Sequence, residues 1–239
     1  MKHGLEPLLL HALPLDGSMW AAQMNLLPGS TYAPSLYSVG NRIEDWTEAA
    51  LSFAKSDRII VAGCSVGGSC ALEIAARAPE RVAALVLIGT KAELRPDPGL
   101  HAEALEVIRN HGLESAWERY WKHLLSPAAA SSVSVEARNI ALRQTREDVA
   151  AGVTAFHTRP SRGHVLTDAP FPVISISGAD DKAPGPKTMA SQAVLAKHGQ
   201  IHIIPDCGHY VPMERPDALN AILRDAIAGV SHPHFDRCL

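Results

Sequence analysis

One short stretch, residues 63–68 with the sequence GCSVGG, contains the residue types that could place a nucleophile at a sharp turn. It matches the pattern G-x-S-x-G and lies between an apolar run and a segment with helical spacing. A strand-to-helix turn strains the backbone of its serine, needs small neighbours, and gains a free N–H and positive potential from the helix. The pattern therefore predicts Ser65 as a nucleophile, and the alternative is a glycine-rich turn that only packs a strand against a helix.

A serine hydroxyl is a poor nucleophile at neutral pH, so this chemistry also needs a base and an acid that orients the base. Among the 12 histidines, His209 is the candidate base because it follows a predicted strand and a glycine, at the edge where loops of an α/β sheet converge. Asp180 and Asp181 follow another predicted strand, and either carboxylate could accept the imidazole N–H. The other aspartate is expected to shape the turn.

Acyl transfer further requires backbone N–H groups aimed at the oxygen that becomes negative. The residue after the nucleophile, Val66, supplies one such N–H. The second is expected from the loop after an early strand, within LLLHALPLDGSMW at residues 8–20.

The elements that would position these residues follow from the hydrophobic pattern. Short apolar runs alternate with helical patterns, which is typical of a parallel sheet with crossover helices. Near-continuous apolar character in two of the runs fits strands buried on both faces. The predicted strands are 7–11, 31–36 (the weakest), 58–63, 82–89, 173–178 and 200–205, and the predicted helices are 41–54, 66–77 and 215–230.

One interval, between the strand that ends near Gly89 and the strand that begins at Val173, is too long for a single crossover. It reads as helical, with Gly112 and a serine-rich segment as breaks. We therefore predict an α/β core of residues 1–95 and 170–239, and a helical cap formed by residues 96–169.

The overall charge excludes some partner classes. The net charge is −3, from 22 basic and 25 acidic residues spread along the chain, which argues against nucleic acid or an anionic membrane as a partner. The apolar run near the N-terminus is too short for a signal segment or a membrane span. We expect a cytoplasmic protein, a monomer or homodimer, that binds a small molecule.

Metal and cofactor chemistry is not indicated by the sequence. The four cysteines, Cys64, Cys70, Cys207 and Cys238, lack the spacing of zinc or redox motifs and are expected to be free thiols. The tail HPHFDRCL holds two histidines and a cysteine, but a tail with chance spacing explains them more simply. We expect no metal and no cofactor.

Taken together, these segments resemble the α/β-hydrolase superfamily. LLLHALPLDGSMW resembles the family's first loop, which usually has His-Gly-x followed by Trp, and GCSVGG resembles its nucleophile elbow. RVAALVLIGTKAE is similar to the next strand, GADDKAPGP to the acid loop, and CGHYVPMERPDALN to the histidine loop and final helix. The order Ser, Asp, His along the chain is also that of this superfamily.

The resemblance implies an α/β-hydrolase fold with a mostly parallel sheet of about six strands, helices on both faces and a helical cap. Residue by residue, it implies Ser65 as nucleophile, His209 as base and Asp181 as acid, since the family places its acid in the pattern Gly-x-x-Asp. The oxyanion donors would be the backbone N–H groups of Leu13 and Val66.

One departure from the family lies in the first loop, where Ala12 stands in place of the usual glycine. It predicts modest strain or a shifted donor at Leu13. Within the superfamily, HALPLDGSMW and SGADDKAP are most similar to the 3-oxoadipate enol-lactonase type of small esterase and lactonase.

The predicted cap offers candidates for the substrate pocket. Trp117, Tyr120, Trp121 and Leu124 recur at helical spacing, and this face either packs the cap onto the core or lines an apolar acyl pocket. Our candidate pocket residues are Trp20, Trp117, Trp121 and Tyr210. Three cap residues are further candidates for binding a substrate carboxylate: His123, Arg143 and His157.

The predicted function is therefore hydrolysis of an ester or lactone of a small, largely apolar substrate, through an acyl-enzyme on Ser65. Two alternatives use the same fold. One is hydrolysis of a carbon–carbon bond in a diketone by the same three residues. The other is a hydrolase-like protein that binds a ligand with little turnover.

Overall fold

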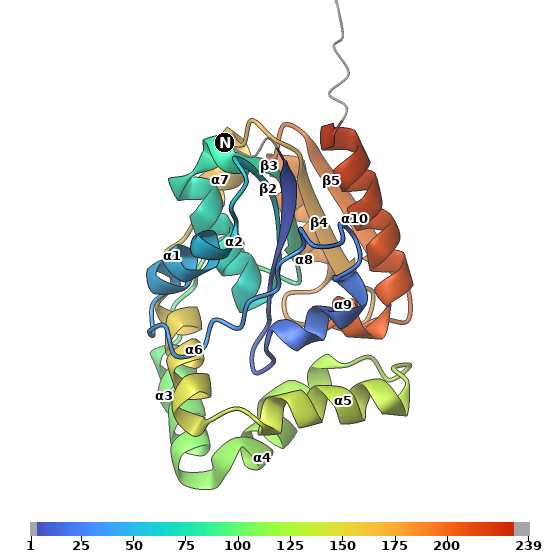
Figure 1. Cartoon of the computed structure of the whole chain (residues 1–239). Helices are drawn as coiled ribbons and strands as arrows, with labels where there is room; N and C mark the ends of the chain where they lie inside the picture. Colours follow the sequence, from blue (N-terminus) through green and yellow to red (C-terminus); the bar gives the residue numbers. More distant parts are fainter. Residues whose placement is uncertain (1–3, 232–239) are drawn as a thin grey trace, which may run out of the picture.

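A computed structural model describes residues 4–231, which form a central sheet flanked by helices (Figure 1). Five parallel strands pair in the order β1-β2-β3-β4-β5. The tail considered above as a chance histidine and cysteine cluster lies outside the described residues. The strands are β1 (Leu5–Leu10), β2 (Arg58–Cys64), β3 (Val82–Ile88), β4 (Val173–Gly178) and β5 (Gly199–Ile204).

The predicted strand at 31–36 is wrong, and the sheet has five strands where about six were expected. Within this segment Tyr32 alone pairs with β1, through an isolated bridge to Leu8 and an N–H that donates to the carbonyl of Pro7 at 2.9 Å. Pro34 follows two residues later and has no N–H, so a ladder cannot continue past it.

Burial follows the position of each strand in the sheet. All seven residues of β3 are buried, as the continuous apolar run predicts for a central strand covered on both faces. Strand β5 lies at the edge and is mostly exposed, including Ile201 and Ile203. The best-packed part of the core therefore lies around β2 and β3, the two strands that lead into the turn at Ser65 and into the long segment before β4.

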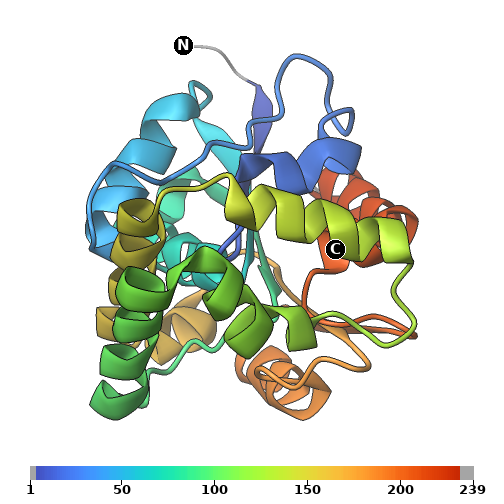
Figure 2. The same ribbon diagram turned by 90° about the horizontal axis from the view of Figure 1, so that it is seen from below.

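Helices cover both faces of the sheet (Figures 1 and 2). On one face α1 packs against α2, α2 against α7, and α7 against α8, whereas α10 lies on the other face with η1 and α9. Among residues 4–231, no helix is long and apolar enough to cross a bilayer. The bounds are η1 (Gly17–Gln23), α1 (Ile43–Phe53), α2 (Val66–Arg77), η2 (Pro79–Arg81), α7 (Gly163–Asp168), α8 (Pro186–Leu195), α9 (Val211–Glu214) and α10 (Pro216–Ser231).

The chain between β3 and β4 forms a layer of helices across one end of the sheet, the end at which the strands finish (Figures 1 and 2). This layer begins and ends inside the predicted cap range of 96–169. Two of its turns are π-helical, η3 and η4, and the second carries the aromatic residues noted in the sequence. The elements are α3 (Pro98–Glu106), η3 (Val107–His111), α4 (Gly112–Ala116), η4 (Trp117–Trp121), η5 (Lys122–Leu124), α5 (Ser131–Leu142) and α6 (Arg146–Thr158).

Candidate active site

Ser65 occupies the turn between β2 and α2 with φ 56° and ψ −119°, a conformation that L-residues adopt at a cost. The turn requires small residues on the helix side, because a side chain at Gly67 would collide with the carbonyl of Leu10. A side chain at Gly68 would likewise collide with Thr90. Gly67 and Gly68 therefore permit α2 to approach the ends of β1 and β3 closely, while Ser65 stays partly exposed. The packing role of these glycines and the exposure of Ser65 are compatible.

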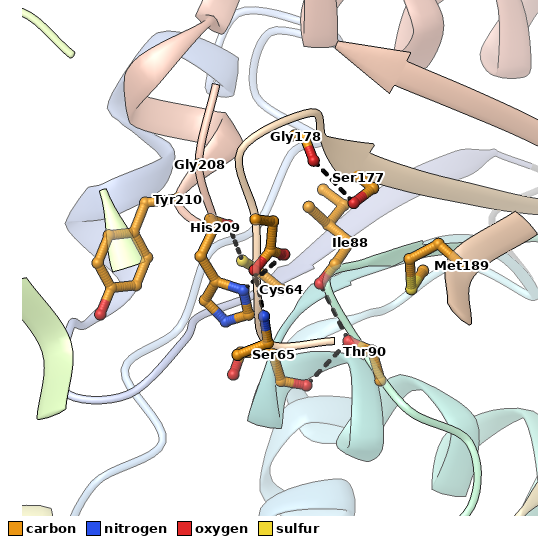
Figure 3. Close-up of polar contacts among 12 residues, drawn as sticks. Cys64, Ser65, Ile88, Thr90, Ser177, Gly178, Met189, Gly208, His209 and Tyr210 are labelled. Atoms are coloured by element: carbon orange, nitrogen blue, oxygen red, sulfur yellow. Dashed lines mark hydrogen bonds and ion pairs between the residues drawn. The ribbon is translucent and has the colours of Figure 1, made fainter. Parts of the chain in front are cut away.

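The strained turn is held by hydrogen bonds to the end of β3. The N–H of Ser65 donates to the carbonyl of Ile88 at 2.9 Å. The Thr90 hydroxyl lies within 3.0 Å of both the Ser65 and the Ile88 carbonyl oxygens (Figure 3). Thr90 had not been selected from the sequence, where a threonine after a strand-ending glycine gives no particular signal.

His209 and Asp181 form a buried pair beside this turn. The His209 Nδ1 and Asp181 Oδ2 atoms are 2.9 Å apart, and the two side chains are 2% and 1% exposed. Burial favours the neutral carboxyl, but the hydrogen bond and charge of His209 and the N–H of Ala183 outweigh it, so the pKa of Asp181 is lowered. The carboxylate therefore stays charged and fixes the imidazole with Nε2 free of this contact.

The neighbouring carboxylate has a different partner. Asp180 is exposed and accepts a hydrogen bond from the Ser126 hydroxyl at 2.6 Å. Of the two candidates for the acid, the structure brings Asp181 to His209 and directs Asp180 to the segment that follows η5. Figure 3 shows the Ser65 side chain next to the imidazole ring of His209, and both residues line one pocket.

A buried carboxylate, Glu214 in α9, organises the loop that carries His209. It accepts hydrogen bonds from the N–H groups of Gly208 at 2.9 Å, Tyr210 at 3.1 Å and Ser126 at 2.9 Å. Glu214 lies in the quoted histidine motif, but the sequence pattern did not predict a role for this residue. It connects the histidine loop to the helical layer above the sheet.

The two expected oxyanion donors lie in different parts of the fold, one in α2 and one in the loop after β1. Val66 is the first residue of α2, and Leu13 lies in the loop after β1 and lines the pocket with Ser65. Within residues 4–231, neither N–H donates to a backbone acceptor outside its own element. The Leu13 carbonyl instead accepts from the Tyr210 hydroxyl at 3.0 Å, which anchors the loop from behind.

The first loop shows no left-handed strain at Ala12, which is not among the residues with positive φ. Its N–H donates to the Met19 sulfur at 3.2 Å. The preceding His11 is fully buried and its Nε2 accepts the N–H of Leu36 at 3.0 Å. Burial lowers the pKa of His11 to about 4, so this histidine is neutral and braces the loop.

An apolar pocket of about 240 Å³ opens above Ser65 and His209. Of the candidate pocket residues, only Trp121 lines it; Trp20 and Trp117 are buried in the core, and Tyr210 stands behind the Leu13 loop. Side chains from four helical elements, α3, η4, η5 and α6, complete the apolar wall. They are Leu100, Ala104, Tyr120, Leu124, Val153 and Phe156.

The three residues left open as carboxylate binders have separate positions. His157 lines the apolar pocket and stacks on His101 with ring centroids 5.0 Å apart. Arg143 is engaged elsewhere, in a two-pronged contact with Asp16 at 2.7 and 2.8 Å. His123 lines a larger open groove of about 840 Å³, which includes Asp181 but neither Ser65 nor His209.

No metal site accompanies these residues within the described part of the chain, where no group of three or more His, Cys, Asp or Glu side chains could hold an ion. Cys64, Cys70 and Cys207 are free, as predicted, and buried. Burial raises the pKa of Cys207 and of Cys70 to about 12. These thiols stay protonated at neutral pH and do not compete with Ser65 as nucleophiles.

Comparison with known proteins shows the family of the chain. Residues 8–222 match the family model described as alpha/beta hydrolase family. The chain belongs to this family. The fold class and the superfamily predicted from the sequence are thereby confirmed, and the protein is an enzyme of the alpha/beta hydrolase superfamily.

Among its relatives are esterases of bacterial origin. The chain is 27% identical to a pimeloyl-[acyl-carrier protein] methyl ester esterase of Aromatoleum aromaticum, with 92% of this chain and 97% of that protein covered. A thermophilic esterase from Thermogutta terrifontis, solved with malate bound, has a TM-score of 0.86 and 28% identity, covering 96% of this chain and 91% of its own.

The enol-lactonase of Burkholderia xenovorans shares the fold. Its TM-score is 0.79 at 21% identity, and the match covers 95% of this chain and 94% of the lactonase. A putative 2-succinyl-6-hydroxy-2,4-cyclohexadiene-1-carboxylate synthase of Bacillus subtilis is 27% identical, with 84% of this chain and 78% of that protein covered. The chain therefore resembles esterases and a synthase in sequence, and it shares its fold with a lactonase.

Proposed function

We propose that the protein is a serine hydrolase that cleaves an ester or lactone of a small, largely apolar substrate through an acyl-enzyme on Ser65. The observation that carries this proposal is the buried His209–Asp181 pair, at 2.9 Å, in the pocket of about 240 Å³ that Ser65 also lines. A pocket below the roughly 300 to 1,000 Å³ of drug-sized sites favours a small acyl group. The esterase relatives support ester cleavage over the other reactions of the family.

The mechanism we propose has two halves. In the first, the Ser65 hydroxyl attacks the carbonyl carbon while Nε2 of His209 takes its proton, and Asp181 stabilises the imidazolium. The tetrahedral oxyanion accepts hydrogen bonds from the N–H groups of Val66 and Leu13. Each of these hydrogen bonds lowers the activation barrier by about 3 to 4 kcal/mol. His209 then protonates the departing alcohol, which leaves the acyl group on Ser65.

In the second half, His209 removes a proton from water, which attacks the acyl-enzyme carbonyl. The resulting oxyanion uses the same two N–H groups. Its collapse returns the proton to Ser65 and releases the acid. A lactone would follow the same steps with the alcohol retained on the product.

The location in the cytoplasm, the monomeric or dimeric state and the division into core and cap stay predictions.

The test is hydrolysis of a panel of nitrophenyl esters of increasing acyl length, together with a lactone, a thioester and a diketone. We expect fastest turnover of short to medium esters. Ser65→Ala is expected to lose at least 10³-fold in kcat, as removal of a nucleophile does in serine hydrolases. Ser69→Ala is the matched control, because Ser69 is a buried serine of the same helix whose hydroxyl has no described partner.

Two outcomes would overturn the proposal. One is the absence of turnover of every ester, lactone and thioester by a folded sample. The other is full activity of the Ser65→Ala protein. A fluorophosphonate adduct that mass spectrometry maps to a peptide without Ser65 would reject the nucleophile alone. Preferential cleavage of the diketone would assign the carbon–carbon bond reaction instead.

A further inference from the structure

A second cavity, of about 310 Å³, also reaches Ser65, and Leu13 of the loop after β1 is not among the residues that line it. It shares five lining residues with the apolar pocket, namely Ser65, Leu100, Phe156, His157 and Ala183, whereas Leu13 and Trp121 line only the apolar pocket. A substrate bound at Ser65 therefore has two adjoining spaces available to it. The first space is apolar. The residues that line the second cavity determine which other chemical group the substrate can carry.

The walls of this second cavity are rich in cationic groups. Lys91 and Arg95, which follow β3, are exposed and lie at its rim, whereas Arg159 at the end of α6 is only 6% exposed. The acidic residue in the lining is Asp97, which is exposed and accepts the N–H of Leu100 at 2.9 Å as the N-cap of α3. The buried charge in the cavity is thus positive.

Among residues 4–231, Arg159 lacks the carboxylate partner that two other arginines of the segment between β3 and β4 have. The guanidinium of Arg143 meets Asp16, and that of Arg162 meets Glu73 at 2.8 Å. Among residues 4–231, no carboxylate lies within ion-pair distance of Arg159. Burial lowers the pKa of its guanidinium to about 10, with no described carboxylate raising it, so the group is still charged at neutral pH.

The contacts of Arg159 satisfy only part of its guanidinium. One N–H donates to the Phe156 carbonyl at the end of α6, and the guanidinium carbon stacks over the Phe156 ring, 4.1 Å from its centroid. The helix end offsets some of the charge, and the stacking fixes the plane of the group. A guanidinium has five N–H donors, and a buried cation without an anion is costly.

We infer that this cavity is a carboxylate subsite, in which Arg159 pairs with the free carboxylate of a substrate that is a half-ester of a dicarboxylic acid. The planar fork of a guanidinium matches a carboxylate with two parallel hydrogen bonds. Lys91 and Arg95 at the rim favour entry of the same anion. The inference rests on the proposed function, because it requires the ester carbonyl of that substrate to sit at Ser65.

The first experiment compares matched substrates on the unmodified protein. Monomethyl adipate carries a carboxylate where methyl hexanoate carries a methyl group, and the methyl ester of adipic monoamide is the neutral polar control. Half-esters of glutarate and pimelate vary the distance between the two groups. We expect kcat/KM for the best half-ester to exceed that of its neutral partners by about 10- to 100-fold, the usual contribution of a charged hydrogen bond. Equal values across the series would overturn the inference.

The second experiment ties the preference to one residue. Arg159→Gln is expected to reduce the ratio of half-ester to neutral-ester kcat/KM by about 10- to 100-fold, and Arg159→Lys is expected to restore part of it. Arg224→Gln, which removes an exposed arginine from α10, is expected to keep the ratio unchanged. An unchanged ratio in a folded Arg159→Gln protein would refute the assignment. If that variant does not fold, the substrate series above and the Arg159→Lys ratio still decide.

A binding measurement separates this inference from the proposed function. In the Ser65→Ala background, calorimetry with monomethyl adipate is expected to give a Kd about 10- to 100-fold lower than with methyl hexanoate, and Arg159→Gln is expected to abolish the difference. Arg159-dependent binding together with no ester turnover by the unmodified protein would refute the proposed function but support the carboxylate subsite. Ester turnover with no preference for the carboxylate would support the proposed function and refute the subsite.

Discussion

Substitution of Gly89 by alanine is expected to disable the site without altering any residue of the proposed triad. Gly89 follows β3 with φ 54°, and its Cα faces the buried pair. An added Cβ would lie 2.7 Å from Nδ1 of His209 and 2.9 Å from Oδ2 of Asp181, the two atoms that share the hydrogen bond. Ordinary carbon contacts begin at 3.4 Å, so the pair must shift by about half an ångström or more.

The magnitude follows from two separate costs. The left-handed backbone costs alanine about 1–2 kcal/mol of stability. Displacement of the imidazole costs activity, by about 10²-fold for a misplacement near 1 Å and by up to about 10⁴-fold if the aspartate contact is lost. We therefore expect kcat/KM for the best nitrophenyl ester to fall by 10²- to 10⁴-fold, with a modest loss of stability in urea denaturation.

Gly29 supplies the matched control, because it has φ 75° and a Cβ there would meet nothing within 4 Å. Gly29→Ala therefore carries similar backbone strain without contact with the site. We expect a similar loss of stability and an activity close to that of the unmodified protein. Activity of Gly89→Ala within threefold of the unmodified protein would refute the reasoning, as would an equal loss of activity in both variants.

Three further predictions concern the surroundings of the site. Asp181→Asn is expected to lower kcat by about 10³- to 10⁴-fold while Asp180→Asn stays within about threefold, and equal losses in ester assays would reject the assignment of the acid. Glu214→Gln removes one of two acceptor oxygens that serve three N–H groups, so we expect about 1–3 kcal/mol less stability in urea and a lower kcat at similar KM; an unchanged kcat would show that this carboxylate does not position the base. For His11, the folded pKa of about 4 lies below the ordinary 6.5, so the unfolded chain binds more protons between these values and stability is lost as pH falls from 6.5 to 4. The loss should approach about 3 kcal/mol and be largely absent in His11→Gln, as measured by urea midpoints at pH 7.0, 5.5 and 4.5; parallel curves for the two proteins would contradict the buried neutral state.

The parts of the site that the sequence predicted are those with a local signature. Ser65, His209 and the aspartate pair each follow a strand within a few residues, so strand ends and turn glycines were enough to place them at one sheet edge. The strand predicted at 31–36 was wrong because a single residue, Pro34, outweighed the β propensity around it.

Residues that act through distant partners could not be predicted in the same way. Glu214 matters because its oxygens meet N–H groups 88 and 6 residues away, and Arg159 because no carboxylate of residues 4–231 lies within reach of it. Trp117 and Trp121 have the same type and helical spacing and both are buried, yet only Trp121 of the two lines the pocket. The π-helical turn between them changes which side chains face inward, and nothing in the sequence pattern announces such a turn.

The helical layer above the sheet and the histidine loop are joined by one backbone hydrogen bond and by the shared Glu214 carboxylate, which links the wall of the apolar pocket to the placement of His209. The N–H of His209 donates to the Leu124 carbonyl at 2.8 Å, and Leu124 also lines the apolar pocket. Ser126, two residues on, shares the Glu214 carboxylate with the histidine loop. A substrate that displaces Leu124 therefore pulls on the backbone of His209, so an acyl group too large for the pocket should reduce kcat as well as weaken binding. Under the proposed mechanism, selectivity for small acyl groups then follows from how His209 is held, in addition to the volume of the pocket.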